Sequence, residues 1–236
     1  MMIDNLGSRV VNAFLLPCGD GYVLIDTGYA GGFRRFRKKL AKRGIEPGQI
    51  RYVFLTHAHD DHAGFLNEVL EATGADVILH PGAVVGLQRG QNSFEGGCSF
   101  FSAWLFCKVL ALFGHGDHRF PAIREEYLDR LIPVGSDRFR ELSFPFSVLE
   151  TPGHTVDHIS LAAGNALFCG DAAMNGFPSR KRITIWIENT EEYRRSWEKI
   201  LETNPAVIYP AHGKAFRTGD LKKYLKSLDR VKLRPL

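Results

Sequence analysis

Residues 56–64 read THAHDDHAG and place five ionisable side chains between two stretches that must pack. The preceding YVFLT is apolar and strand-like, whereas the following AGFLNEVLEAT has the apolar spacing of an amphipathic helix. Imidazoles and carboxylates crowded at such a junction repel and desolvate one another unless something binds them. A cation resolves that conflict, so the chain must fold in a way that gathers metal ligands just past the end of a strand.

The spacing within this segment predicts which side chains share a cation. His57 and His59 are two residues apart, so at the frayed end of a strand both rings can reach one point. Asp61 and His62 fall in the first turn of a helix expected to run to about residue 73, and they can serve a second point close by. Imidazole nitrogen and carboxylate oxygen are ligands that suit zinc, iron and manganese.

Three further ligand-type residues follow predicted strands. They are His154 in LETPGHT, Asp171 in LFCGDA and His212 in VIYPAHG. Asp26, in VLIDTG, has the same setting, and we interpret it as a residue that fixes ligands by hydrogen bonds. Because α/β sheets gather their sites at the carboxyl ends of strands, we expect these side chains to join those of residues 57–62.

Strands dominate both halves of the chain, and each half ends in strand–helix units. Strands are expected at 10–16, 21–25, 51–56, 76–80, 132–134, 146–149, 159–162, 166–169 and 206–209, and helices at 32–43, 60–73, 191–203 and 220–231. This order predicts a single α/β domain over residues 1–236, with two sheets packed together and helices outside.

An insertion at about residues 81–127 stands apart from this pattern. Within it, CSFFSAWLFCKVLALF at 98–113 is apolar on nearly every side, and such a helix must be buried against something. A core or dimer-interface helix is the favoured interpretation. A lid over a hydrophobic substrate, with Phe101 and Trp104 as contacts, and a membrane contact are the alternatives.

Two polar groups have weaker interpretations. GHGDHRF holds His115, Asp117 and His118, which we interpret as exposed loop polarity rather than a second site. SRKR at 179–182 follows Asp171 closely and is either a solvated loop or a contact for an anionic substrate group.

Composition narrows the partners and the compartment. The net charge of +4 is modest for 236 residues, so it gives no strong nucleic-acid signal. The basic helix at 32–43 is interpreted as a solvated face, and a phosphate-binding surface is the less favoured alternative. No apolar stretch is long enough to span a bilayer and no secretory leader is recognised, so we expect no transmembrane segment. Four cysteines without a CxxC pair favour a reducing, cytoplasmic location.

The motifs VLIDTG, THAHDDHAG, TPGHTVDH, FCGD and YPAHG, in this order, resemble the metallo-β-lactamase superfamily. The resemblance implies an αββα sandwich of two mixed sheets with outer helices and a dinuclear metal centre. By matching position, the implied ligands of the first metal are His57, His59 and His154, those of the second are Asp61, His62 and His212, and Asp171 bridges the two. His158 is expected to support these ligands.

The resemblance implies a hydrolase in which a hydroxide bridging two divalent ions, zinc before iron or manganese, attacks a small ester, lactone or thioester. Asp61 would also orient that hydroxide and pass its proton to the leaving group. The bridging carboxylate of Asp171 is similar to that of the glyoxalase II, lactonase and ribonuclease branches. Met174 stands where lactonases carry a Tyr, and we expect it to contact the substrate. A phosphodiesterase or nuclease with the same centre, and a mononuclear iron enzyme like the persulfide dioxygenases, are the alternatives.

Overall fold

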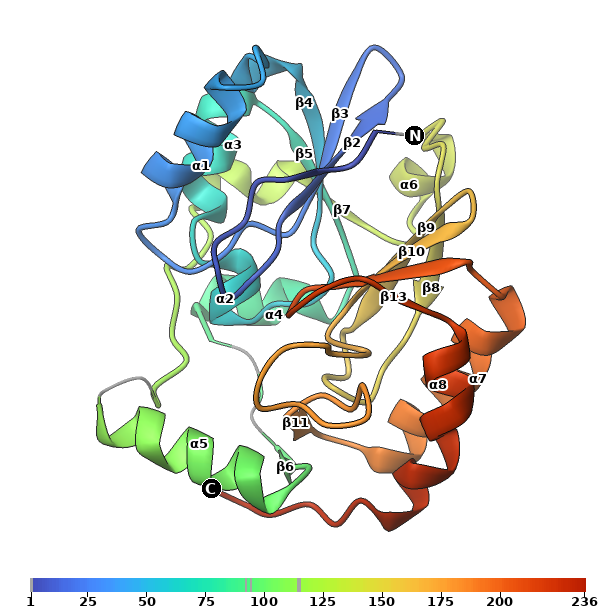
Figure 1. Ribbon diagram of the computed structural model, residues 1–236. Helices are drawn as coiled ribbons and strands as arrows, with labels where there is room; N and C mark the ends of the chain where they lie inside the picture. Colours follow the sequence, from blue (N-terminus) through green and yellow to red (C-terminus); the bar gives the residue numbers. More distant parts are fainter. Residues whose placement is uncertain (1, 92, 94, 114–115) are drawn as a thin grey trace. The chain divides into compact units, whose positions relative to one another are not determined.

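The computed structural model describes residues 2–91, 93, 95–113 and 116–236, so His115 lies outside the described residues. The chain separates into two compact units (Figure 1). Unit 1 comprises Met1–Asn92 and Arg119–Pro145, and unit 2 comprises Ser93–His118 and Phe146–Leu236. The expected insertion is therefore divided between the units, and the assignment of residues 1–236 to a single domain stays a prediction.

Unit 1 is built on a six-stranded mixed sheet with the order β1-β2-β3-β4-β5-β7. Its strands are β1 (Asp4–Asn5), β2 (Phe14–Cys18), β3 (Gly21–Ile25), β4 (Ile50–Phe54), β5 (Asp76–Leu79) and β7 (Leu131–Pro133). From β3 onward, neighbouring strands are parallel, so the carboxyl ends of β3 and β4 lie at the same edge. The strand expected at 10–16 begins later, because the Ser8 hydroxyl accepts the amides of Val10 and Val11 in a turn.

Among the described residues, five helices belong to unit 1. They are α1 (Phe33–Ala41), α2 (Asp60–Ala63), α3 (Leu66–Thr73), α4 (Ala83–Arg89) and α6 (Asp137–Glu141), with 3-10 turns at Pro47–Gln49 and Glu125–Arg130. Figure 1 shows α1 and α3 side by side, and the buried Phe36 and Leu40 of α1 share a core with Val69 and Leu70 of α3.

The single helix expected at 60–73 is wrong. It is broken between α2 and α3, where Phe65 leaves the helical conformation with φ −127° and ψ 33°. The break brings Gly64 against the backbone of Gly28 and Ala30, where a Cβ would lie 2.4 Å from the Ala30 nitrogen. A tertiary contact therefore overrides the helical periodicity at this point.

Unit 2 contains a five-stranded mixed sheet with the order β13-β12-β10-β9-β8 and a two-stranded ribbon β11-β6. Its strands are β6 (Gly97–Cys98), β8 (Ser147–Glu150), β9 (Ile159–Ala163), β10 (Ala166–Gly170), β11 (Trp186–Ile187), β12 (Val207–Pro210) and β13 (Phe216–Arg217). Strand β9 is antiparallel to both β8 and β10, and β12 is parallel to β10, so β8, β10 and β12 end at one edge.

The helices of unit 2 are α5 (Phe101–Leu112), α7 (Thr190–Thr203) and α8 (Gly219–Tyr224), with a 3-10 turn at Leu225–Arg230. The helix expected at 220–231 is therefore half α-helix and half 3-10 turn. The Asn189 side chain caps α7 by accepting the amides of Glu191 and Glu192. Its buried residues, including Tyr193 and Trp197, form the unit's core with β10 and β12.

The prediction that the 98–113 helix is a core element is wrong for the chain alone. Only Ala103 of α5 is buried, while Phe101 is 59% exposed and Leu112 is 85% exposed. The helix is anchored by its first half, where Trp104 packs with Ala103 against Cys98 and Trp186. Within the described part of the chain, no helix combines the length and the apolar content needed to cross a bilayer.

Candidate metal-binding site

The ligand-type residues of unit 1 converge at the carboxyl end of β4. We call His57, His59, Asp61 and His62 the unit 1 cluster. His57 Nε2 lies 3.1 Å from His59 Nδ1, and His62 Nε2 lies 3.5 Å from Asp61 Oδ1. The rings of His57 and His62 are 4.0 Å apart between centroids. All four residues are buried, so these charges and lone pairs meet in a poorly hydrated space.

Asp26 fixes two of these rings from the neighbouring strand. Its carboxylate lies 2.9 Å from His62 Nδ1 and accepts the Thr56 amide at 2.8 Å and the Thr56 hydroxyl at 2.8 Å. Because a carboxylate accepts, His62 Nδ1 carries the proton and its Nε2 keeps a lone pair. The Thr56 hydroxyl, having donated to Asp26, accepts from His57 Nδ1 at 3.0 Å, which leaves His57 Nε2 with a lone pair as well.

The backbone around Asp26 holds this arrangement in place. Asp26 has φ 56°, a left-handed conformation that Asp tolerates better than most residues. The next residue, Thr27, donates both its amide and its hydroxyl to the His62 carbonyl, each at 2.7 Å. The loop after β3 is thereby tied to helix α2, which carries Asp61 and His62.

The ligand-type residues of unit 2 come from three loops at one edge of its sheet. We call His154, Asp171 and His212 the unit 2 cluster. They follow β8, β10 and β12 respectively. Asp171 Oδ2 lies 3.7 Å from His154 Nε2 and 3.6 Å from His212 Nε2, so one carboxylate oxygen faces both rings.

Backbone groups orient this second cluster. His154 Nδ1 lies 2.8 Å from the Trp186 carbonyl, which can only accept, so Nδ1 carries the proton and Nε2 keeps a lone pair. His158 Nε2 accepts the Asp171 amide at 3.0 Å, and its Nδ1 therefore donates to the Thr151 hydroxyl at 2.9 Å. His158 thus holds the Asp171 backbone, and its Nε2 lone pair is occupied.

Gly153 permits the turn that presents His154. It has φ +124°, and a Cβ there would lie 2.3 Å from the Tyr193 nitrogen at the start of α7. The Gly153 carbonyl accepts the amides of Glu188 and Asn189, which joins the turn to the segment after β11. Only glycine fits this close approach.

The three expected substrate contacts lie in unit 2. Phe101 and Trp104 stack with centroids 5.7 Å apart, and Trp104 Nε1 donates to the Pro235 carbonyl at 3.1 Å. Met174 is buried three residues after Asp171, with its amide bonded to the Arg182 carbonyl. Through the β6–β11 pair, Cys98 faces Trp186, so the base of α5 is connected to the residue that orients His154.

The SRKR segment is engaged inside unit 2. Arg182 donates to Asp220 Oδ2 at 2.9 and 2.8 Å and lies over the Phe216 ring. Its charge is therefore satisfied by a carboxylate of the same unit. This favours the structural interpretation of the segment over an anionic substrate contact.

Trp186, Thr56, Thr151 and Tyr193 are site-supporting residues that sequence reasoning missed. Trp186 acts through its carbonyl, and Tyr193 through a buried hydroxyl that accepts the Thr184 amide at 3.1 Å. Burial raises the pKa of the Tyr193 hydroxyl above its usual range. Thr56 and Thr151 lie inside the histidine motifs THAHDDHAG and TPGHTVDH, so their sequence positions could have suggested their roles.

Each cluster has the donor set of a divalent-cation site. In unit 1, the ligand atoms of His57 and His59, of His57 and His62, and of Asp61 and His62 lie within 4.8 Å of one another. The hydrogen bonds of the Nδ1 atoms leave Nε2 of His57, His62 and His154 with lone pairs, as metal binding requires. These His and Asp clusters are therefore able to bind metal.

The chain belongs to the metallo-β-lactamase superfamily, because the model of that family matches residues 6–212. This confirms the resemblance drawn from the sequence motifs. Solved structures of the superfamily confirm the predicted α/β fold. One of them is the HARLDQ motif mutant S60 of a metallo-β-lactamase from Cronobacter sakazakii, with a TM-score of 0.69 at 18% identity. The match covers 97% of this chain and 89% of that chain.

Relatives of similar sequence match most of this chain, but this chain covers a varying share of their own length. A metallo-β-lactamase fold-containing protein, ST1585 of Sulfurisphaera tokodaii, is 26% identical over 89% of this chain and 76% of its own, and its structure has a TM-score of 0.66. A Bacillus subtilis probable metallo-hydrolase, YflN, is 28% identical over 89% of this chain and 83% of its own. The chain spans only 55% of a Caenorhabditis elegans beta-lactamase-like protein 2 homolog, at 26% identity over 86% of this chain.

Proposed function

We propose that the two clusters together hold two divalent cations, zinc first, and hydrolyse a small ester, lactone or thioester. One cation would be held by His57, His59 and His154 and the other by Asp61, His62 and His212, with Asp171 shared between them. The observation that carries the proposal is the pair of oriented ligand sets: Asp26 and the Trp186 carbonyl accept from Nδ1 of His62 and His154, which leaves Nε2 of each ring with a lone pair. The order of the motifs along the chain supports the same assignment.

Two cations bound there would supply Lewis acidity that ionises water near neutral pH. The chain's own residues would then position the reactants. Asp61, at the start of α2, would orient the attacking oxygen and transfer a proton to the leaving group. No Ser or Cys nucleophile is needed.

A panel of chromogenic substrates tests the reaction class. Esters, lactones, thioesters, phosphodiesters and a cephalosporin would be assayed on protein of known metal content. We expect turnover of an ester, lactone or thioester that disappears after chelation and returns with zinc. Turnover that survives complete chelation would contradict the proposal.

Metal analysis separates this proposal from the iron alternative. About two zinc ions per chain are expected, because the clusters offer two sets of ligands. A single iron, together with oxygen consumption on a persulfide, would move the assignment to a dioxygenase-like enzyme.

A phosphodiesterase activity is the second candidate, and the basic surface of α1 favours it. Arg34, Arg35, Arg37, Lys38, Lys39 and Lys42 lie on or at the end of this helix. Preferential turnover of the phosphodiester in the same panel would establish it.

For the exposed face of α5 we propose two competing roles, self-association through 98–113 and a lid over the substrate. Phe101 and Trp104 would contact a hydrophobic substrate, as would Met174. Light scattering on the wild type and Trp104→Asp decides between the two roles. If the helix is a lid, the variant keeps the solution mass of the wild type; if the helix forms a dimer interface, the variant has a lower solution mass. The cytoplasmic location stays a prediction from the cysteine pattern.

A further inference from the structure

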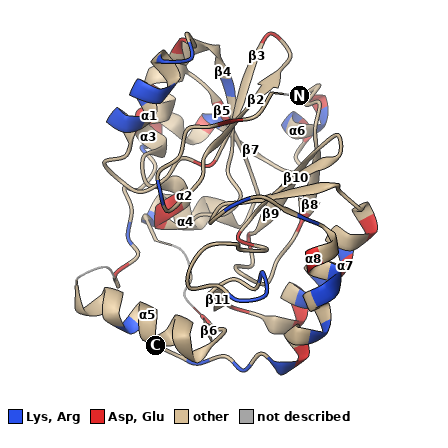
Figure 2. Ribbon diagram, in the orientation of Figure 1, with Lys and Arg blue, Asp and Glu red and all other residues tan. Residues whose placement is uncertain are grey.

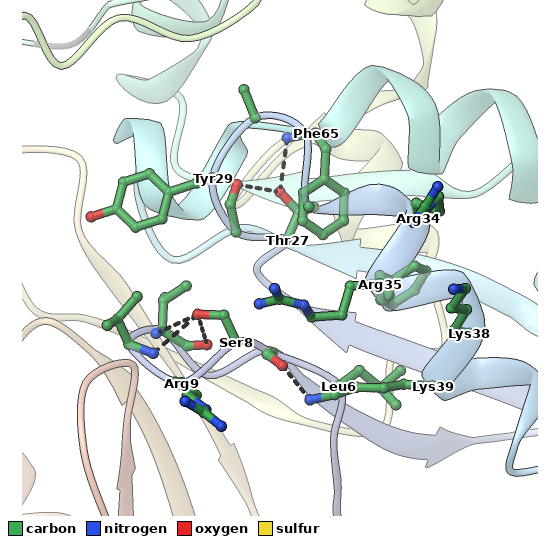
Figure 3. A pocket seen from close by; sticks show the side chains of 18 residues that line it. Leu6, Ser8, Arg9, Thr27, Tyr29, Arg34, Arg35, Lys38, Lys39 and Phe65 are labelled. Atoms are coloured by element: carbon green, nitrogen blue, oxygen red, sulfur yellow. Dashed lines mark hydrogen bonds between the residues drawn. The ribbon is translucent and has the colours of Figure 1, made fainter. Parts of the chain in front are cut away.

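A cavity of about 1000 Å³ lies in unit 1, beside the unit 1 cluster. Three segments line it: residues 6–11 before β2, residues 27–32 after β3, and the exposed side of α1, with Phe65 at its base. In Figure 3, Arg35 extends from α1 into the space between Ser8 and Thr27. We call this cavity the basic pocket.

The lining of the basic pocket carries positive charge and no negative charge. Its charged residues are Arg9, Arg34, Arg35, Lys38 and Lys39, and no Asp or Glu is among the lining residues. Within the described part of the chain, the structure records no ion pair for any of these five. Figure 2 shows the same concentration of Lys and Arg on α1.

Lys39 and Arg35 are close enough for their positive charges to repel each other. Burial, followed by the charges of Arg43 and Arg35, lowers the pKa of Lys39 below its usual range. Lys39 also donates to the Gly7 carbonyl, which holds its ammonium group at the pocket. An anion in the pocket would relieve this repulsion, because opposite charge stabilises the protonated amine.

Helix α1 adds to the positive field. It begins after Gly32 with no side-chain cap and no acidic residue in its first turn, and Gly31 and Gly32 line the pocket. Amide groups at a helix start favour an anion. Tyr29, 45% exposed, lies at the rim and offers a hydroxyl and a ring face.

The pocket reaches the unit 1 cluster through one residue. Thr27 lines the pocket, and its amide and hydroxyl both donate to the His62 carbonyl at 2.7 Å. Its neighbour Asp26 binds the His62 ring. A molecule held in the pocket would therefore lie next to the ligand loop, within the same unit.

We propose that the basic pocket binds a phosphate group of the substrate, at a position apart from the bond that is hydrolysed. This rests on the proposed function and names its substrate class: a phosphorylated small molecule. Arginine forks match phosphate oxygens in pairs, and two or three such groups around one cavity suit a dianion better than a single carboxylate. The cations surround one cavity instead of following a long stripe, which favours a small molecule over a polymer.

Calorimetric titration of phenylphosphonate, which cannot be hydrolysed, into the metal-loaded full chain tests the proposal. Arg35→Gln with Lys38→Gln should weaken binding by at least about tenfold, because two charge-assisted contacts are lost. The matched control is Arg37→Gln with Lys42→Gln, which removes the same charge from exposed positions of α1 or its end that do not line the pocket. The control should change the affinity by less than about twofold, since screened charges outside the pocket act weakly.

Equal affinities in the two variants, or no binding by the wild type, would overturn the assignment. The assignment would also be overturned if DNA or RNA oligonucleotides bound more tightly as their length increased and their affinity fell steeply with salt. Such behaviour is typical of an extended surface that binds a polyanion. Thermal melting of the two variants checks that both fold alike, and Arg34→Gln alone provides a milder second variant. Because binding is measured without turnover, phosphonate binding with no hydrolysis refutes only the proposed function, and hydrolysis with no phosphonate binding refutes only the pocket.

Discussion

The two clusters achieve the same preorganisation by different means. The unit 1 cluster takes four ligand-type residues from six consecutive positions at one strand-to-helix junction, and a side chain, Asp26, orients it. The unit 2 cluster takes three residues from three loops between positions 154 and 212, and a main-chain carbonyl, that of Trp186, orients its first histidine.

Because of this difference, a single substitution is expected to have different effects in the two clusters. In unit 1, the network from Asp26 through Thr56 to His57 consists of side chains, so one substitution can release a ligand. In unit 2, orientation depends on the backbone path of the Gly153 turn and the β11 segment, so the fold itself must shift before His154 turns. Substitutions can test this contrast directly.

The largest expected effect follows from Asp61→Ala. The change removes a proposed metal ligand of the unit 1 cluster that is also the proposed proton carrier, so turnover should fall by about 10³-fold or more. Steady-state kinetics at saturating zinc measure it. Asp60→Ala, one position away in α2, is the control and should stay within a few-fold of wild type. Full activity in Asp61→Ala would remove this residue from the mechanism.

Asp26→Asn should be next in size. The amide no longer enforces a protonated Nδ1 on His62, so metal affinity should fall by roughly 10- to 100-fold. Competition with a chromogenic chelator gives the affinity, and Asp20→Asn, on the exposed β2–β3 turn, serves as control. Unit 2 offers no matching side chain for His154, because its partner is a carbonyl. Unchanged affinity in Asp26→Asn would show that the ring is held by packing instead.

The same contrast explains how far the sequence could predict the site. His57, His59, Asp61 and His62 share a local motif whose chemistry is legible without a fold. The members of the unit 2 cluster could be expected because each follows a strand and the superfamily motifs recur in order. The Trp186 carbonyl could not, because a backbone acceptor carries no side-chain signature and its position depends on where β11 pairs with β6.

The fold shows a similar limit. β3 was predicted with its observed bounds, since a short apolar run between turn residues has few alternatives. The break at Gly64 and Phe65 was missed because it is imposed by Gly28 and Ala30, more than thirty positions earlier. The basic pocket was missed for the same reason: Arg9 and Arg35 are far apart in sequence, and the pattern of α1 alone is typical of a solvated face.

Two glycine substitutions compare how tightly each ligand loop is packed. Gly153→Ala adds a Cβ 2.3 Å from the Tyr193 nitrogen at φ +124°, whereas Gly64→Ala adds one 2.4 Å from the Ala30 nitrogen at an ordinary helical φ of −62°. Both should lower the free energy of unfolding by about 1–3 kcal/mol through overpacking, and Gly153→Ala by more because of backbone strain, worth about 1–3 kcal/mol again.

Chemical denaturation measures these losses, with Gly48→Ala as control because a Cβ there meets nothing within 4 Å. An equal or smaller loss in Gly153→Ala would mean that the unit 2 turn can relax. The greater dependence of this cluster on its backbone would then be wrong.

The smallest expected effect is a pH dependence confined to unit 2. Burial, followed by the nearby charge of Asp157, raises the pKa of Glu188 to about 7, although its carboxylate accepts the Val156 amide. The folded state therefore binds more protons than the unfolded state between about pH 4.5 and about 7, so wild-type stability falls as pH rises through this window. Solvent screening of this half-buried group keeps the effect modest.

Glu188→Gln cannot titrate but keeps an oxygen for the Val156 amide, so its stability should decline less than that of the wild type across the same window. Melting temperatures measured at several pH values reveal the difference between the two proteins, which removes the contribution of the histidines common to both. Glu202→Gln, on the exposed side of α7, should follow the wild type. If the wild type and Glu188→Gln give parallel curves, the segment that supports the His154 turn does not sense pH, and its hold on the histidine depends on backbone geometry alone.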